Sequence, residues 1–129
     1  MDMEATFPGG KKVAVHYRGL SVVTDQPRQV GGDDTALSPT ELFLASIVAC
    51  AGYFVLVFCT QRNISLEGIK VTQSMEVDPR THLVSRLIID IRLPEGFPEQ
   101  YRPAVIRAVD QCTVKRHLQN PPAIEVRTV

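Results

Sequence analysis

The residues whose chemistry stands out in this chain are its three cysteines, Cys50, Cys59 and Cys112. A cysteine thiolate is a nucleophile, so two cysteines that meet in the fold could form and break a disulfide. Cys50 and Cys59 lie nine residues apart in a predicted helix, so they face opposite sides of it and are roughly 13 Å apart along its axis. They cannot pair without unfolding that helix. A working pair would therefore join Cys112 to either Cys50 or Cys59.

The alternative is that all three cysteines are small buried side chains with no reactivity. Cys50 lies too far inside its predicted helix for the N-terminal dipole to lower its pKa much. A reactive Cys50 would therefore need a cation from another segment. Arg18 and Arg28, which precede the helix in a turn and in a loop, are the candidates.

The histidines and the glycine-rich stretch do not indicate a metal or a cofactor. His117 follows Cys112 by five residues, which is not a typical ligand spacing, and His16 and His82 lie on predicted strands. The stretch Gly31-Gly32-Asp33-Asp34 lacks the strand–turn–helix context of a phosphate loop, so it is interpreted as a turn. We expect no cofactor and no bound metal.

The segment that carries Cys50 and Cys59 is predicted to be one long helix. Ser38 and Glu41 have the spacing of a capping box, with Pro39 at the first helical position. The helix then runs to about Arg62. Before it, residues 11–25 predict two short strands that turn at Arg18-Gly19, followed by a loop rich in Gly, Pro and Asp.

The second half of the chain predicts two strands, a helix and a final strand. Two segments, 66–79 and 82–96, alternate between apolar and polar residues. Their expected inward side chains are Ile69, Val71, Met75 and Val77 in the first and Leu87, Ile89, Ile91 and Leu93 in the second. A helix follows from about Arg102 to Leu118, with Val105, Val109 and Cys112 on its apolar stripe. Residues 123–129 are expected to be a strand.

This order, β-β-α-β-β-α-β, predicts an α+β fold with mostly antiparallel sheets around a buried central helix. Residues 1–129 have the length of a single domain. The uncharged run Leu42–Cys59 just reaches the length of a membrane span, but no Lys or Arg flanks its start and the chain has no Trp. A core helix is the better interpretation. One small sheet cannot cover it alone, so we expect a dimer that encloses two such helices.

Composition narrows the function classes. The formal net charge is zero, which provides no basic surface for nucleic acid or for an anionic membrane. The first ten residues contain acids and no apolar core, so no signal peptide is indicated. We expect a cytoplasmic protein, in which a reducing environment keeps the odd number of cysteines as thiols.

The sequence resembles the OsmC/Ohr family, which contains osmotically inducible protein C and the organic hydroperoxide resistance proteins. The matching features are Gly31-Gly32, Pro39, Glu41-Leu42 and the two cysteines, Cys50 on the central helix and Cys112 much later. The ending "CTVKRHLQNPPAIEV" is also similar to that family. The resemblance covers about Lys11 to Val129.

This resemblance implies an intertwined homodimer with its sites at the dimer interface. It implies that Cys50 attacks the O–O bond of an organic hydroperoxide and becomes a sulfenic acid, that Cys112 condenses with it to a disulfide, and that an external dithiol reduces that disulfide. An arginine would hold the thiolate and a glutamate would orient the arginine, which makes Arg18, Arg28 and Glu41 the further site candidates. Cys59 has no counterpart in the family and is expected to pack in the core.

The chain departs from the hydroperoxide-resistance branch at two places. Thr40 occupies the position of the glutamate that follows the proline in that branch, and Glu41 comes one residue later. Thr113 replaces the proline that usually follows the second cysteine. Arg18 is favoured over Arg28 because it lies near the place where that branch keeps its arginine.

Three functions compete. The first is a thiol-dependent hydroperoxide reductase acting in defence against oxidative stress. The second is a non-catalytic dimer of the same fold that binds an apolar small molecule, and the third is a purely structural protein. The enzyme requires Cys50 to have a low pKa and to lie within bonding reach of Cys112, whereas the other two require neither.

Overall fold

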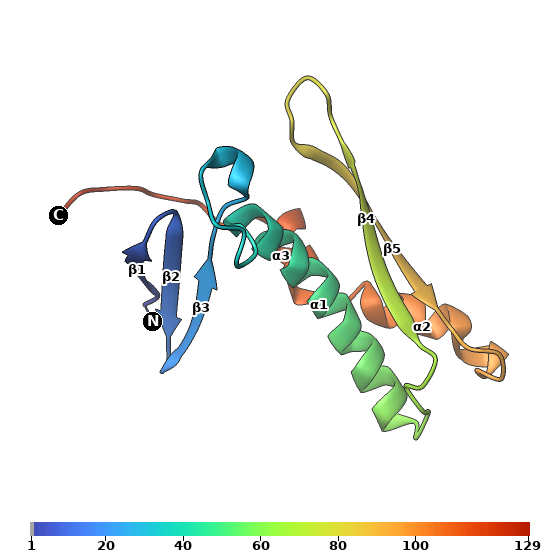
Figure 1. Cartoon of the computed structure of the whole chain (residues 1–129). Helices are drawn as coiled ribbons and strands as arrows, with labels where there is room; N and C mark the ends of the chain where they lie inside the picture. The colour runs from blue at the N-terminus through green and yellow to red at the C-terminus, as the bar shows by residue number, and fades with distance from the viewer. Residues whose placement is uncertain (1) are drawn as a thin grey trace. The chain divides into compact units, whose positions relative to one another are not determined.

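The computed structural model describes residues 2–129, and its contacts divide the chain into two compact units, Met1–Ala45 and Ser46–Val129. Figure 1 traces the chain. The helix α1 (Pro39–Gln61) begins in the first unit and continues into the second. Each unit is described by itself. That the chain forms a single domain stays a prediction.

The first unit contains a three-stranded antiparallel sheet in the order β1-β2-β3. Its strands are β1 (Glu4–Gly9), β2 (Lys12–Tyr17) and β3 (Leu20–Thr24). The predicted pair with a turn at Arg18-Gly19 corresponds to β2 and β3 and is confirmed. The strand β1 was not predicted, because it is almost wholly exposed and so has no apolar alternation. It pairs with β2, and Thr6 is hydrogen-bonded to His16 at 2.8 Å.

The loop that joins β3 to α1 is ordered around the buried carboxylate of Asp25. This carboxylate accepts hydrogen bonds from the backbone N–H of Gln26 (2.8 Å), from the backbone N–H of Thr35 (3.1 Å) and from the Thr35 hydroxyl (2.7 Å). Gly31 has a φ of 90°, which favours glycine, and ends the short 3-10 helix η1 (Arg28–Val30). At Gly32, a Cβ atom would lie 1.9 Å from the Gln26 carbonyl oxygen. The two glycines therefore serve the loop backbone.

The capping box at the start of α1 is confirmed. The Glu41 carboxylate accepts a hydrogen bond from the Ser38 backbone N–H at 2.8 Å, and the Glu41 N–H donates to the Ser38 hydroxyl at 3.2 Å. The predicted helix from Ser38 to about Arg62 corresponds closely to α1.

The second unit packs a β-hairpin and the helix α2 against its part of α1, and α3 follows α2 in the chain (Figure 1). These elements are β4 (Lys70–Val77), β5 (Val84–Arg92), the 3-10 helix η2 (Glu99–Tyr101), α2 (Arg102–Val109) and α3 (Thr113–Gln119). The strands β4 and β5 are antiparallel, with Val71 opposite Ile91 and Gln73 opposite Ile89. Both predicted strands are confirmed. Their predicted inward residues are partly buried near α1, but Met75 and Val77, which were also expected to point inward, are about half exposed.

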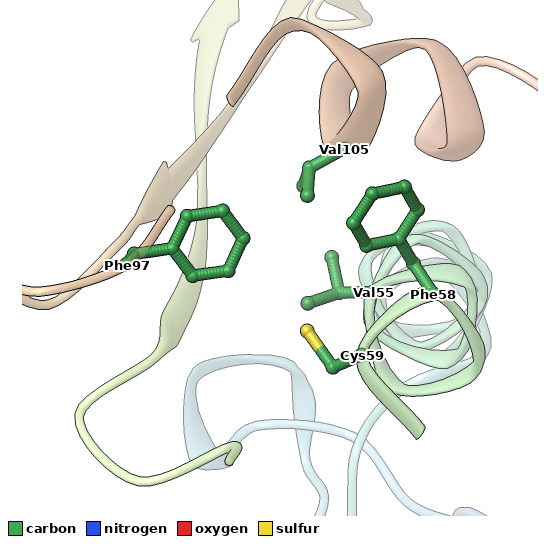
Figure 2. Packing of buried hydrophobic residues seen from close by; sticks show 5 residues of the cluster. All are labelled: Val55, Phe58, Cys59, Phe97 and Val105. Carbon is green, nitrogen blue, oxygen red and sulfur yellow. The ribbon is translucent and has the colours of Figure 1, made fainter. Parts of the chain in front are cut away.

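The core of the second unit is a small cluster on one side of α1. Val55, Phe58 and Cys59 from α1 meet Phe97, which follows β5, and Val105 of α2 (Figure 2). All five side chains are at least 95% buried. The cluster fixes α2 against α1 and thereby sets the position of the chain that follows α2.

Two predicted elements of the second unit differ from the structure. The single helix predicted from Arg102 to Leu118 is broken into α2 and α3, and Cys112 lies in the break. The prediction of a strand over residues 123–129 is wrong for a single chain, because this segment forms neither helix nor strand. A strand requires a neighbour for its backbone hydrogen bonds, and here Ile124 and Val126 are 86% and 92% exposed. The α+β class with antiparallel sheets is nevertheless confirmed.

Candidate functional site

The structure brings Cys50 and Cys112 together. Cys50 lies in the middle of α1, and Cys112 immediately precedes α3. Hydrogen bonding between their side chains lowers the pKa of Cys50 and raises the pKa of Cys112. Both are free thiols in this structure, and they are close enough to interact directly. Of the two pairings that helix geometry left open, the structure therefore supports Cys50 with Cys112.

The break between α2 and α3 is what places Cys112. Its N–H donates to the Val109 carbonyl at 3.0 Å and closes α2, and its own carbonyl accepts from the Arg116 N–H at 3.0 Å and opens α3. Between these bonds Cys112 has an extended backbone, with φ −49° and ψ 123°. The side chain is buried, as its place on the apolar stripe predicted, although the residue is not helical.

The same break supplies two backbone donors to Cys50. The N–H groups of Val114 and Thr113, in the first turn of α3, bond to the Cys50 sulfur. The sequence did not predict these donors, because its apolar spacing favoured one continuous helix through this region. Thr113-Val114, two adjacent β-branched residues directly after Cys112, do not mark the break, because both residues are helical in α3.

The two thiols differ in acidity. Burial raises the pKa of Cys50, but the hydrogen bonds from the Cys112 thiol and from the Val114 and Thr113 amides outweigh it, so the Cys50 pKa is lower than that of an ordinary thiol. Burial raises the pKa of Cys112, and donating its proton to Cys50 raises it further. Cys50 is therefore the more acidic thiol of the pair and Cys112 the less acidic one.

A cavity of about 690 Å³ adjoins this pair in the second unit. Its walls come from α1, β5 and α2 and are mainly apolar, including Ile47, Ala51, Leu87, Ile89, Ile91 and Val109. Of the two cysteines in the pair, Cys112 lines the cavity within the described part of the chain. A cavity of this size and lining can hold a small organic molecule with an apolar body.

The charged residues at the cavity are largely paired. Lys115 forms an ion pair with Asp110 at 2.7 Å across the break between α2 and α3, and Arg102 forms one with Glu99 at 2.9 Å. Asp90 also contributes to the lining. Because two cations are already neutralised by carboxylates, the cavity favours an uncharged chain over a strongly ionic ligand.

Cys59 lies apart from this pair. It is fully buried in the core cluster with Val55 and Phe58 (Figure 2), and burial raises its pKa. A buried thiol with a raised pKa is a poor nucleophile. The expectation that Cys59 packs in the core is in accord with this position.

The three charged candidates lie in the first unit. Arg18 is exposed in the turn between β2 and β3, has a φ of 53°, and stacks over the Tyr17 ring at 5.1 Å. Arg28 is exposed at the start of η1. Glu41 is engaged in the capping box. Whether any of the three acts on the Cys50 thiolate stays a prediction.

The sequence profile of the OsmC-like protein family matches residues 31–127, which include the end of the first unit, nearly all of the second and both cysteines of the pair. The chain belongs to the OsmC family. No curated protein matches the chain.

Solved structures with an OsmC fold superpose on most of this chain. A proposed osmotic stress induced and detoxification response protein from Psychrobacter arcticus 273-4 is 22% identical, with a TM-score of 0.70 over 88% of this chain and 85% of that one. The organic hydroperoxide resistance protein OsmC from Legionella pneumophila is 20% identical, with a TM-score of 0.58 over 92% and 90% of the two chains. A proposed organic hydroperoxide resistance protein from Vibrio cholerae, with captopril bound in one of its active sites, is 21% identical, with a TM-score of 0.55 over 94% and 86%.

The OsmC fold also accounts for the apolar helix. By length and composition α1 could cross a membrane, and one third of its most apolar window is buried within the chain. The OsmC-like fold indicates a non-membrane protein, in agreement with the interpretation of the sequence.

Proposed function

We propose that this OsmC-family protein is a thiol-dependent peroxidase that reduces organic hydroperoxides in defence against oxidative stress. The observation that carries the proposal is that the side chains of Cys50 and Cys112 interact directly, in a site where the pKa of Cys50 is lowered and that of Cys112 is raised. Membership of the family whose structures include organic hydroperoxide resistance proteins supports it.

In this proposal the Cys50 thiolate attacks one oxygen of the peroxide, the O–O bond breaks, and the departing alkoxide takes up a proton and leaves as an alcohol. Cys50 is then a sulfenic acid. The Cys112 sulfur attacks the Cys50 sulfur, water leaves, and a Cys50–Cys112 disulfide forms. An external dithiol returns both cysteines to thiols and is itself oxidised to a disulfide. No metal or cofactor is needed.

Two features around the Cys50–Cys112 pair support this chemistry. The amides of Thr113 and Val114 stabilise the Cys50 thiolate and would equally stabilise it as a leaving group. The apolar cavity beside Cys112 suits an organic molecule better than water or hydrogen peroxide. Arg18 or Arg28 would add a cation to the thiolate, with Glu41 as the carboxylate that orients it.

We also propose that the protein works as a cytoplasmic homodimer. Tyr53 and Leu56 on α1 are 58% and 42% exposed in the single chain, which is unusual for the central helix of a fold. A second copy that packs its α1 against this face would cover them.

The runner-up is a non-catalytic dimer that binds an apolar small molecule. The cavity by itself fits this function as well as the first. What favours the enzyme is the thiol pair, because a binding protein has no use for a cysteine with a lowered pKa beside a second thiol.

The deciding experiment is a titration with a limiting dose of cumene hydroperoxide, followed by peptide mass mapping. The parent protein should lose two thiols and gain an intrachain Cys50–Cys112 disulfide, with Cys59 still free. Cys50→Ser should not consume the peroxide. Cys112→Ser should react once and hold a sulfenic acid that excess peroxide overoxidises.

Cys59→Ser is the matched control and should turn over normally. If Cys50→Ser consumes cumene hydroperoxide as fast as the parent, the peroxidase proposal fails and the binding protein becomes the better account.

A further inference from the structure

The outward face of the β-hairpin carries two cations directly opposite each other. Lys70 begins β4, Arg92 ends β5, and the two residues are partners in the antiparallel register. The side chains of such partners lie on the same face with their Cβ atoms roughly 5 Å apart, and like charges in this arrangement destabilise a sheet. Within residues 2–129, neither Lys70 nor Arg92 forms an ion pair that would offset the repulsion.

The other end of the same face has the opposite arrangement. Near the tip of the hairpin, Glu76 lies opposite Arg86, and the two form an ion pair at 3.2 Å. Opposite charges across a pair of strands stabilise the sheet. The like-charged pair is therefore a property of the open end of the hairpin, where β4 begins and β5 ends, and not of the whole face.

The strand backbones hold the two cations in place. The residues on either side of Lys70 and of Arg92 pack against the core cluster of the second unit; they are Ile69, Val71, Ile91 and Leu93. Just outside the hairpin, Gly68 lies so close to Pro94 that a Cβ atom on the glycine would be 3.0 Å from the Pro94 Cβ. The strands are therefore fixed at this end, and the repulsion is relieved only by side-chain movement or by a bound anion.

A hollow of about 370 Å³ lies at the two cations. It is lined by Lys70, Thr72, Asp90, Ile91 and Arg92. Thr72 and Asp90 are the next pair of partners on the outward face, because residues two apart in a strand share a face. The lining therefore combines an ammonium, a guanidinium, a hydroxyl and a carboxylate, and its four polar residues are exposed to solvent.

The groups in this lining determine the kind of ligand. Two cations less one carboxylate leave one net positive charge. The paired N–H groups of a guanidinium match two oxygens of a carboxylate or a phosphate, and the Thr72 hydroxyl can donate a further hydrogen bond. Asp90 repels a second negative charge. We propose that this hollow is a binding site for a singly charged oxyanion, either a carboxylate or a phosphate diester. The proposal goes beyond the peroxidase function and does not depend on it.

The hollow can be altered without altering the apolar cavity. Asp90 and Ile91 contribute to both linings, whereas Lys70, Thr72 and Arg92 line the hollow alone. Variants at Lys70 and Arg92 therefore leave the cavity beside Cys112 unchanged. Both residues are exposed, so their replacement should not endanger folding.

An NMR titration of the whole chain labelled with ¹⁵N tests the site. The probes are acetate and dimethyl phosphate, and sodium chloride at the same ionic strength is the reference. At least one probe should give saturable shifts at the amides of Lys70, Thr72 and Arg92 that sodium chloride does not give. Saturation by acetate alone identifies the ligand group as a carboxylate, and saturation by dimethyl phosphate alone identifies it as a phosphate diester.

Arg92→Met should weaken binding of that probe by about tenfold or more, because it removes charge-assisted hydrogen bonds. Arg86→Met is the matched control, since Arg86 lies on the same face of the same strand and outside the hollow. It should bind as the parent does. Shifts that stay linear and equal those in sodium chloride overturn the proposal, as does an equal loss of binding in Arg92→Met and Arg86→Met.

A variant of Asp90 tests the preference for a single charge. The parent should bind dimethyl phosphate, a monoanion, more tightly than methyl phosphate, which is largely a dianion above pH 7. Asp90→Asn adds one net positive charge and should reverse that order. If acetate is the only probe that saturates, malonate replaces methyl phosphate as the dianion and acetate is the monoanion. An order that Asp90→Asn leaves unchanged contradicts the role of Asp90 in selecting the ligand.

A second measurement tests the repulsion itself. Without a probe and at low salt, Lys70→Met should raise the melting temperature by about 1–3 °C, because it removes one of two like charges that face each other. The probe should then stabilise the parent more than this variant, since a ligand of the folded state stabilises only a protein that binds it. A melting temperature that falls in Lys70→Met would show that Lys70 supports the hairpin by itself, and would overturn the proposal.

Discussion

Cys50 of α1 and Cys112, in the break between α2 and α3, lie close enough for their side chains to interact, and hydrogen bonding between them lowers the pKa of Cys50 and raises that of Cys112. Cys112 therefore loses its proton less readily than an ordinary thiol, and Cys50 loses its proton more readily. The contact exists because α2 ends before Cys112 and α3 begins after it, so that the chain turns its first free amides toward α1.

The first prediction concerns the Thr113 amide. Thr113→Pro should raise the Cys50 pKa, because proline has no N–H to donate. The helix should survive, since Thr113 is the first residue of α3, where proline is favoured, and Cys112 already has the extended backbone that a following proline requires. The pH dependence of Cys50 alkylation measures the pKa of this thiol. Peptide mapping separates the Cys50 signal from those of the other two cysteines.

Thr113→Ala keeps the N–H and serves as the control for loss of the side chain. Its alkylation profile should match that of the parent. An unchanged profile in Thr113→Pro, with α3 still formed by circular dichroism, would remove the amide from the account of Cys50 acidity.

The second prediction concerns the arginines. If one of them holds the thiolate, Arg18→Met or Arg28→Met should raise the Cys50 pKa, because an opposite charge nearby favours the ionised thiol. The reactive thiolate should then appear only at higher pH in the alkylation profile. Arg80→Met, an exposed arginine between β4 and β5, is the control. Profiles that stay the same in both single variants would refute a role for either arginine.

The third prediction concerns the dimer. Sedimentation velocity at low protein concentration should give twice the chain mass. Tyr53→Glu combined with Leu56→Glu places two carboxylates on the exposed apolar face of α1 and should weaken association by about a hundredfold or more, because a buried carboxylate without a partner is unfavourable. Leu66→Glu, outside this face, should leave the mass unchanged. A parent protein that sediments as a stable monomer would contradict the prediction.

The sequence predicted the elements that carry strong local signals. The capping box of Ser38 and Glu41 fixed the start of α1, and alternation located β4 and β5. The break at Cys112 carries neither proline nor glycine, and the apolar spacing of Val105, Val109 and Cys112 suits a continuous helix equally well, so tertiary packing decides it.

The candidate site was predictable only in part, for the same reason. Helix geometry excluded a Cys50–Cys59 pair, and the family resemblance selected Cys112 as the partner of Cys50. The amides of Thr113 and Val114 could not be found before the break was known. The strand expected over residues 123–129 has a strand-like pattern but no neighbour in its own chain, and an isolated strand does not form.

The last prediction concerns Asp25, whose carboxylate organises the loop before α1. The hydroxyl of Thr35 and the backbone N–H of Gln26 bond to it and lower its pKa from 3.8 to about 2. A carboxyl with a lowered pKa in the folded state stabilises the fold fully above its unfolded value and loses that contribution as the pH falls from about 4 toward 2. Asp25→Asn should therefore lower the melting temperature at neutral pH, by roughly 5 °C, and the difference from the parent should shrink near pH 3.

Asp34→Asn is the control for this measurement, because Asp34 is exposed and its φ of 56° is one that asparagine adopts readily. Its melting temperature should follow that of the parent at both pH values, which separates the effect of the Asp25 carboxylate from a general change in net charge. Thermal unfolding followed by circular dichroism at the two pH values gives all three curves. If the gap between Asp25→Asn and the parent is as wide near pH 3 as at neutral pH, ionisation of Asp25 contributes nothing to stability, and only the shape of its side chain orders the loop.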